Sequence, residues 1–197
     1  MISTEKTSVI SEVKRAAKHF AVSFAALAVI LCGAGIMSPM EASASAIPNK
    51  GAIAIYVSGP SKRHVDSSYA LITKKLLAKG YKVVDAAVRA RIEKQILQGK
   101  VARAVLAGDG AAIKKLSAGN AFSVMIAVGI EADDEPEVNE FKLYTGTATA
   151  SVNATSAAGA ILYGGTGSAK QVGYTKGETS QKAIEAAVAK TIDEMLQ

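Results

Sequence analysis

The alternation of hydrophobic and polar positions is most regular near the C-terminus, where it predicts two long strands at 141–154 and 158–174. In the first strand, small or apolar residues occupy every second position from Tyr144 to Ala154, and mostly hydroxyl-bearing residues lie between them. A period of two is typical of a strand with one buried and one solvated face. A short turn at 155–157 joins the strands. The sequence therefore predicts a long two-stranded segment, the β-ribbon.

Shorter apolar segments predict the elements around the β-ribbon. Segments 51–57 and 122–130 are apolar on both faces, which is typical of strands inside a sheet, and the second is expected to be the central strand. A short strand is predicted at 81–84. Helices are expected at 66–79, from 85 to 98, at 100–107, at 109–118 and at 179–196. Asp66 and Asp85 are expected to cap the first two helices, and Gly80 and Gly99 to end them.

This order of elements, β-α-β-α-(α)-β-β-β-α, predicts an α+β fold, an α/β sandwich in which helices pack on one mixed sheet. The first half contains β-α-β crossovers, which give parallel pairs, and the second half is an antiparallel meander. Residues 47–197 number 151, about the length of one domain. We expect a single domain that ends in the long β-ribbon and a helix.

Residues 1–46 have the features of an export signal. Lys14, Arg15 and Lys18 supply positive charge, and the uncharged apolar segment 20–36 follows. Two overlapping small-x-small sites then favour cleavage after Ala46, with Ala44 as the alternative. The apolar segment has 17 residues, close to the minimum of about 17 for a spanning helix, so an uncleaved membrane anchor is the competing interpretation. Cleavage predicts a periplasmic or secreted protein.

The position of Cys32 disfavours a lipoprotein. It lies inside the apolar segment and follows Leu31, whereas lipidation needs a small residue before a cysteine at the end of that segment. Cleavage near Ala46 leaves no cysteine, which suits a periplasmic domain without disulfides.

The charge of the exported part is modest. Removing the four basic and three acidic residues of 1–46 from totals of 23 and 17 leaves a net charge of +5. This charge permits peripheral contact with a membrane or cell wall. Aromatic residues are not interleaved with the basic ones, so nucleic-acid binding is disfavoured.

The loop 58–64 is the main candidate for ligand binding. It connects a predicted strand to a helix, and helix N-termini attract anions through their free N–H groups. Lys62 and Arg63 add positive charge beside Ser58 and His64. These four residues form a candidate site for a small anionic or cell-wall-derived ligand. The competing interpretation is a solvated loop before a helix that Asp66 caps.

Signals for catalysis, cofactors and metals are weak. His64 is the only histidine of 47–197, and no nucleophile-elbow motif is present, so an envelope hydrolase is the least favoured hypothesis. The glycine-rich segment 164–170 lacks phosphate-loop spacing and lies in a predicted strand, where glycines favour a bulge, a bend or close packing by the last helix. The acidic segment 133–137, within a predicted connection at 131–140, lacks calcium-loop spacing and is expected to be a solvated hairpin loop. We predict no enzyme activity, cofactor or metal.

Three segments resemble the CsgG/LpoB-like family of envelope proteins, which includes the curli-secretion lipoprotein, the penicillin-binding-protein activator and TolB N-terminal-like domains. They are the apolar strand VMIAVG at 124–129, the long ribbon at 147–167 and the alanine-rich helix GETSQKAIEAA at 177–187. The segment GYKVVD at 80–85 is similar to the short strand before the second helix of that family.

The resemblance implies a bacterial envelope protein without enzymatic activity that binds another protein or assembles with itself. We expect the working surface on the polar face of the β-ribbon, at Thr145, Thr147, Thr149 and Ser151, or at an edge strand that accepts a partner strand.

Overall fold

The computed structural model describes residues 47, 48, 50–136 and 143–197, which all belong to one compact unit. The predicted signal at 1–46, with Cys32 and the cleavage sites after Ala44 and Ala46, lies outside these residues, as do 137–142. None of the helices in the described ranges is long and apolar enough to cross a lipid bilayer.

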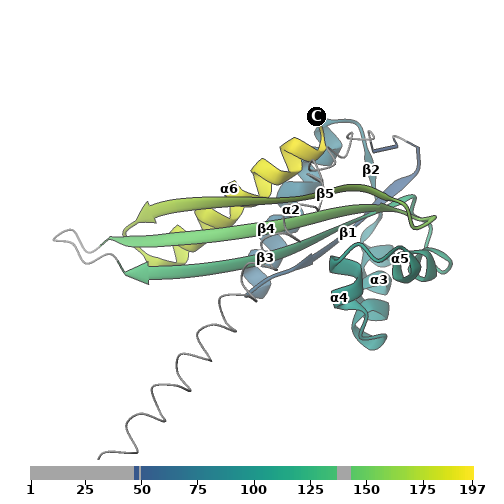
Figure 1. The fold of residues 1–197 in the computed structure, drawn as a ribbon, viewed down its shortest axis with the longest axis horizontal. Coiled ribbons are helices and arrows are strands. Elements are labelled where there is room, and N and C mark those ends of the chain that lie inside the picture. Colours follow the sequence, from purple (N-terminus) through teal and green to yellow (C-terminus); the bar gives the residue numbers. More distant parts are fainter. Residues whose placement is uncertain (1–46, 49, 137–142) are drawn as a thin grey trace, which may run out of the picture. The chain divides into compact units, whose positions relative to one another are not determined.

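The fold is α+β: five helices pack on one open, mixed sheet of five strands within the described ranges (Figure 1). The strands are β1 (Ala52–Ser58), β2 (Lys82–Val83), β3 (Val124–Pro136), β4 (Tyr144–Ser156) and β5 (Ile161–Gly173). The helices are α2 (Lys62–Ala78), α3 (Ala86–Gln98), α4 (Ala102–Leu106), α5 (Gly110–Ser117) and α6 (Lys176–Met195). The predicted order of elements and fold class are confirmed.

The strand order is β2-β1-β3-β4-β5, so β3 is the central strand, as its apolar sequence predicts. β1 pairs in parallel with β2 and β3, because each connection crosses over through helices. β3, β4 and β5 form the antiparallel meander. β1 accompanies β3 only as far as Gly129, so the second half of β3 extends beyond it together with β4 and β5.

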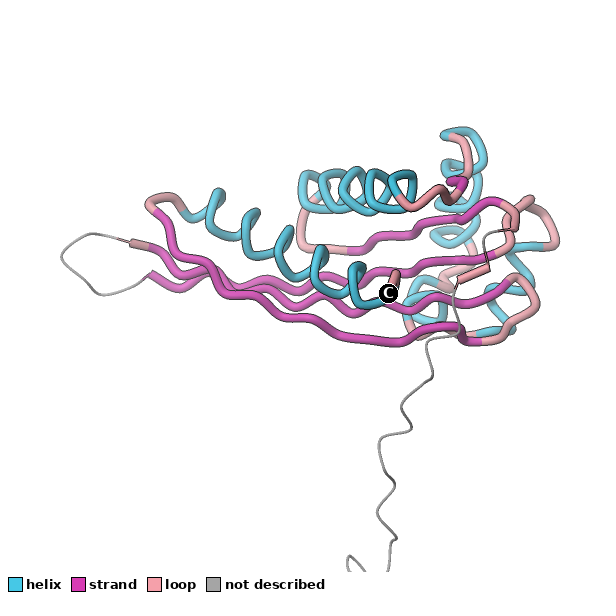
Figure 2. The backbone as a smooth tube through the Cα atoms, turned by 90° about the horizontal axis from the view of Figure 1, so that it is seen from above, coloured by secondary structure: helices cyan, strands magenta, loops and turns pink. Residues whose placement is uncertain are grey.

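Helices α2 and α6 cover one face of the sheet (Figures 1 and 2). The alternate small residues of β4, Ala148 to Ala154, all point to this face and are buried. They meet the stripe of α6 that contains Ala183, Ala187 and Val188. Small side chains on both elements let the helix lie close to the strand, and the apolar surface removed from water stabilises the pair.

Helices α3, α4 and α5 cover the opposite face, but only beside β1, the first half of β3 and the end of β4. Tyr56, Met125 and Ala127 belong to this second cluster, together with Ile92, Ile96 and Ile113 of the helices. Beyond them, the same face of β3, β4 and β5 carries polar side chains, most of them exposed. We define this open face by Glu131, Asp133, Thr147, Thr149, Ser151, Thr166, Ser168 and Lys170.

Three sequence predictions are wrong in detail. Helix α2 begins at Lys62, not near Asp66, because the Ser61 hydroxyl accepts from the backbone N–H of His64 at 3.3 Å and caps the helix. Asp66 instead lies 3.9 Å from Arg89 Nη2. The turn of the β-ribbon occupies 157–160 instead of 155–157, and a register shift at Ala154/Thr155 precedes it.

The third correction concerns the predicted acidic connection at 131–140. Residues 131–136 continue β3 and pair with β4, from Glu131 opposite Thr149 to Pro136 opposite Tyr144. The strand therefore continues past its apolar segment. Its outward positions Glu131 and Asp133 are exposed to solvent, so they can be charged. The remainder of the predicted loop, 137–140, lies outside the described residues.

Candidate functional site

The residues of the predicted anion site do not converge. Lys62, Arg63 and His64 occupy the first turn of α2, where Lys62 and Arg63 are exposed and His64 is half-buried. Ser58 ends β1 and lines a cleft on the opposite side of the sheet from α2, and none of the other three residues lines that cleft. The four residues of the predicted anion site are thus divided between the first turn of α2 and a cleft on the other side of the sheet.

The serine hydroxyls near His64 hydrogen-bond to its backbone and not to its imidazole. Ser67 Oγ donates to the main-chain carbonyl of His64 at 3.1 Å and accepts from Gln181 Nε2 at 2.7 Å. Buried His64 Nδ1 has no hydrogen-bond partner among the described residues. The local sequence therefore places hydroxyls near His64 along the helix without aiming one at the imidazole.

The predicted partner-facing residues of the β-ribbon are brought together on β4, with one exception. Thr147 and Ser151 are exposed on the open face, and Thr149 between them is half-buried. Thr145 is only 5% exposed, so its prediction as a surface residue is wrong. Val172 of β5 stands directly opposite Thr145.

A cleft of about 300 Å³ lies where the helical layer ends and the open face begins. Its walls come from Ser58 at the end of β1, Leu106 at the end of α4, Gly129 to Glu131 on β3, and Thr149 and Ser151 on β4. The cleft lies at the carboxyl end of the parallel strand β1, where the next strand of the sheet continues without it. Clefts beyond the carboxyl ends of parallel strands are the usual binding positions in α/β sheets.

One wall of the cleft is fixed by hydrogen bonds from β4. Asn153 Nδ2 donates to the carbonyl of Leu106 at 2.7 Å, and Thr155 Oγ1 donates to the carbonyl of Gly108 at 3.4 Å. Both side chains follow the alternation of the open face, but they lie under α4 and its loop and satisfy carbonyls at the end of that helix. Leu106 is therefore held in place before any ligand arrives.

The polar lining of the cleft consists of hydrogen-bond acceptors and hydroxyls. Glu131 contributes a carboxylate, and Ser58, Thr149 and Ser151 contribute hydroxyls, with Ser151 Oγ 3.4 Å from Thr166 Oγ1. No lysine, arginine or histidine among the described residues forms an ion pair with Glu131. Sequence reasoning missed Glu131 and Leu106, because the strand was expected to end at Ile130 and α4 has no polar motif.

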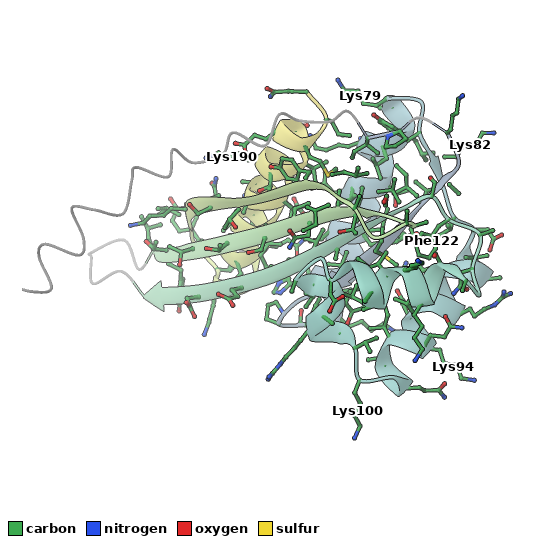
Figure 3. All side chains as sticks on the ribbon, turned by 45° about the vertical axis from the view of Figure 1, so that its right-hand side comes forward. Lys79, Lys82, Lys94, Lys100, Phe122 and Lys190 are labelled. Carbon is green, nitrogen blue, oxygen red and sulfur yellow. The ribbon has the colours of Figure 1, made fainter. Side chains whose placement is uncertain are left out.

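Within the described ranges, positive side chains are spread over several elements and do not gather at one site. Lys79, Lys82, Lys94, Lys100 and Lys190 project outward from different elements, whereas Phe122 is 7% exposed and belongs to the second core cluster (Figure 3). Arg89 lies 3.6 Å over the ring of Tyr69 and pairs with Glu93 at 2.7 Å. This distribution suits solubility better than recognition of a polyanion.

The glycine-rich segment 164–170 lies inside β5, as predicted, and at least one of its glycines is needed for packing. A Cβ on Gly167 would collide with Thr191 Oγ1 and lie 3.1 Å from the carbonyl oxygen of Ala187. Both residues belong to α6, so Gly167 permits the close approach of that helix. On the side of β5 that faces α6, Gly167 therefore serves packing and not ligand binding.

No protein-family model matches the chain, and no curated protein matches it. Among solved structures, the lipoprotein GNA1162 from Neisseria meningitidis is similar, with a TM-score of 0.46 and 18% sequence identity. The match covers 72% of this chain and 96% of the lipoprotein.

Proposed function

We propose that this chain is an exported, non-enzymatic protein-binding or assembly module of the bacterial envelope. Its working surface is the open face of β3, β4 and β5 together with the outer edge of β5. Export follows from the predicted signal at 1–46, and the envelope role follows from the CsgG/LpoB-like resemblance. The observation that carries the proposal is a long three-stranded surface that no other described element covers.

The open face is suited to specific docking because it is polar and α6 supports the sheet behind it. Thr147, Ser151, Thr166 and Ser168 present hydroxyls from two adjacent strands. Hydroxyls on a fixed backbone donate and accept hydrogen bonds at little entropic cost, which favours a polar, specific interface.

The outer edge of β5 adds a second means of binding. β5 is the last strand of the sheet and spans 13 residues, and no other described strand pairs with its outer side. The free edge of β3 beyond Gly129 is different, because its sequence contains four acidic residues and then Pro136. Charges and proline at an edge oppose strand addition, so β5 is the edge that accepts a partner strand.

Site-specific photo-crosslinking in the producing cells tests the proposal. A photoreactive residue at Ser168, which is exposed on the open face, should form an adduct with a defined partner or with a second copy. The matched control is Leu77 of α2, which is 57% exposed but lies on the other side of the sheet. Light scattering of the purified protein separates self-association from binding of another protein.

A further variant tests whether the adduct depends on the surface. Thr147→Arg places a bulky charge on the open face at an exposed position, so the free energy of unfolding should change by less than about 0.5 kcal/mol. The adduct at Ser168 should disappear in this variant. Equal adducts at Ser168 and Leu77, or no adduct from a strictly monomeric protein, would contradict the proposal.

A further inference from the structure

We infer that the cleft beside Leu106 binds the side chain of a lysine or arginine from the docked partner. The inference rests on the proposed function, because the partner supplies the cation. It specifies which chemistry the partner must present at one point of the open face.

The charge of the cleft selects the ligand. Among the described lining residues Glu131 contributes the only carboxylate, and none of the described basic residues neutralises it through an ion pair. Ser58, Thr149 and Ser151 supply further acceptors around the same volume. A cationic donor satisfies a carboxylate and hydroxyls together, and charge-assisted hydrogen bonds are about twice as strong as neutral ones.

The shape of the cleft requires a ligand with a hydrocarbon stem. Leu106 forms an apolar wall, and Gly129 leaves the floor without a side chain. The volume of about 300 Å³ lies at the lower end of the range for small-molecule sites, roughly 300–1,000 Å³. Lysine and arginine combine an aliphatic stem with a charged end, so the stem would lie along Leu106 while the charge reaches Glu131.

The position of the cleft makes it suitable as an anchor point. It opens at the border between α4 and the open face, so a partner on Thr147 and Ser168 lies beside it. The hydrogen bond from Asn153 to the Leu106 carbonyl keeps its wall in place. A preformed pocket lowers the entropic cost of inserting one side chain, which is how anchor residues dominate many interfaces.

Titration with small analogues tests the cleft independently of any partner. The probes are n-butylguanidinium and n-butylammonium, and N-butylurea is the neutral control of nearly the same shape. Amide chemical shifts of Gly129, Glu131, Thr149 and Ser151 report binding. We expect saturable shifts with both cations, little with N-butylurea, and weaker binding as salt is raised.

Two charge-neutralising variants localise the effect. Glu131→Gln should weaken n-butylguanidinium binding about tenfold, as expected for the loss of one charge-assisted hydrogen bond. Asp133→Asn removes the same charge from the same face of β3, but Asp133 does not line the cleft. At physiological salt its effect should stay below about twofold, because an exposed charge roughly 7 Å from Glu131 along the strand acts through high-dielectric water and is partly screened.

The possible results separate this inference from the proposed function. No saturable shift, equal binding of N-butylurea, or equal effects of the two variants would overturn the inference. A crosslink at Ser168 without n-butylguanidinium binding leaves the proposed function standing and removes the cleft as its anchor. Binding that Glu131→Gln weakens and Asp133→Asn preserves supports it.

Discussion

The contact between β5 and α6 predicts the outcome of one small substitution, Gly167→Ala. Gly167 is buried on the face that packs against α6, and its backbone φ is not positive, so alanine meets no backbone restriction there. The added methyl group instead collides with Thr191 Oγ1 and lies 3.1 Å from the Ala187 carbonyl oxygen. If the Thr191 side chain rotates away, it loses the 2.9 Å hydrogen bond that its hydroxyl donates to the carbonyl oxygen of Ala187.

The magnitude follows from the cost of overpacking. Inserting a methyl group into a packed site costs about 1–3 kcal/mol. Thr191 is fully buried, and Tyr163 Oη donates to its carbonyl at 3.4 Å, so the helix is tied to the sheet at this point. We therefore expect the free energy of unfolding to fall by about 2 kcal/mol.

The same substitution elsewhere and a double variant serve as controls. Gly177 lies in the first turn of α6, and a Cβ added there would have no neighbouring atom within 4 Å, so Gly177→Ala should stabilise the protein by about 0.5–1 kcal/mol. Thr191→Ala removes the colliding hydroxyl, so Gly167→Ala should cost at least about 1 kcal/mol less in that background.

Urea unfolding followed by circular dichroism measures these differences, with a common slope m as evidence that the denatured state is unchanged. If Gly167→Ala were as stable as the wild type, the close approach of α6 to β5 would be refuted. If its cost were the same with and without the Thr191 hydroxyl, the assigned collision would be wrong.

Three further predictions address the cap of α2, the pKa of Tyr56 and an ion pair. Ser61→Ala should cost about 1 kcal/mol in urea unfolding, because Ser61 caps α2, whereas Asp66→Ala should cost less than about 1 kcal/mol because its ion pair is exposed. Burial raises the pKa of Tyr56 above its ordinary value, so the unfolded chain loses that proton first as pH rises. The free energy of unfolding should therefore fall above about pH 10. Tyr56→Phe should make this fall shallower, and an unchanged pH profile in the variant would contradict the prediction. Lys75 Nζ lies 2.6 Å from Asp193 Oδ1 and joins α2 to α6, so Lys75→Met should cost below about 1 kcal/mol, and the difference should shrink in high salt.

Much of the candidate surface could be predicted from the sequence because its signals are local. The alternation from Tyr144 to Ala154 identified the face of β4 that α6 covers, and it placed Thr147, Thr149 and Ser151 on the other. Asp85 was expected to cap α3, and its carboxylate accepts from the Val88 N–H at 2.8 Å. Such features depend on neighbours within a few residues, so the chain encodes them directly.

Other features depended on contacts that local patterns do not specify. Asp66 and Ser61 are both good capping residues, and the position at which β1 ends and α2 docks decided between them. The acidic sequence from Glu131 onward predicts a loop, although pairing with Thr149 extends the strand through Glu131. A polar residue is compatible with either a loop or the outward face of a strand, and only the partner strand distinguishes them.

By itself, the sequence determined the order of the elements, the mixed sheet and the polar side of β4, since these follow from hydrophobic periods of two or 3.6 residues. Only the tertiary structure decided that Ser58, Leu106, Glu131 and Thr149 line one cleft, and that Gly167 lies against Thr191. Those groupings join residues from separate elements, and their proximity depends on strand order and helix docking. Both are fixed by how the whole core packs, which no short segment of the chain encodes.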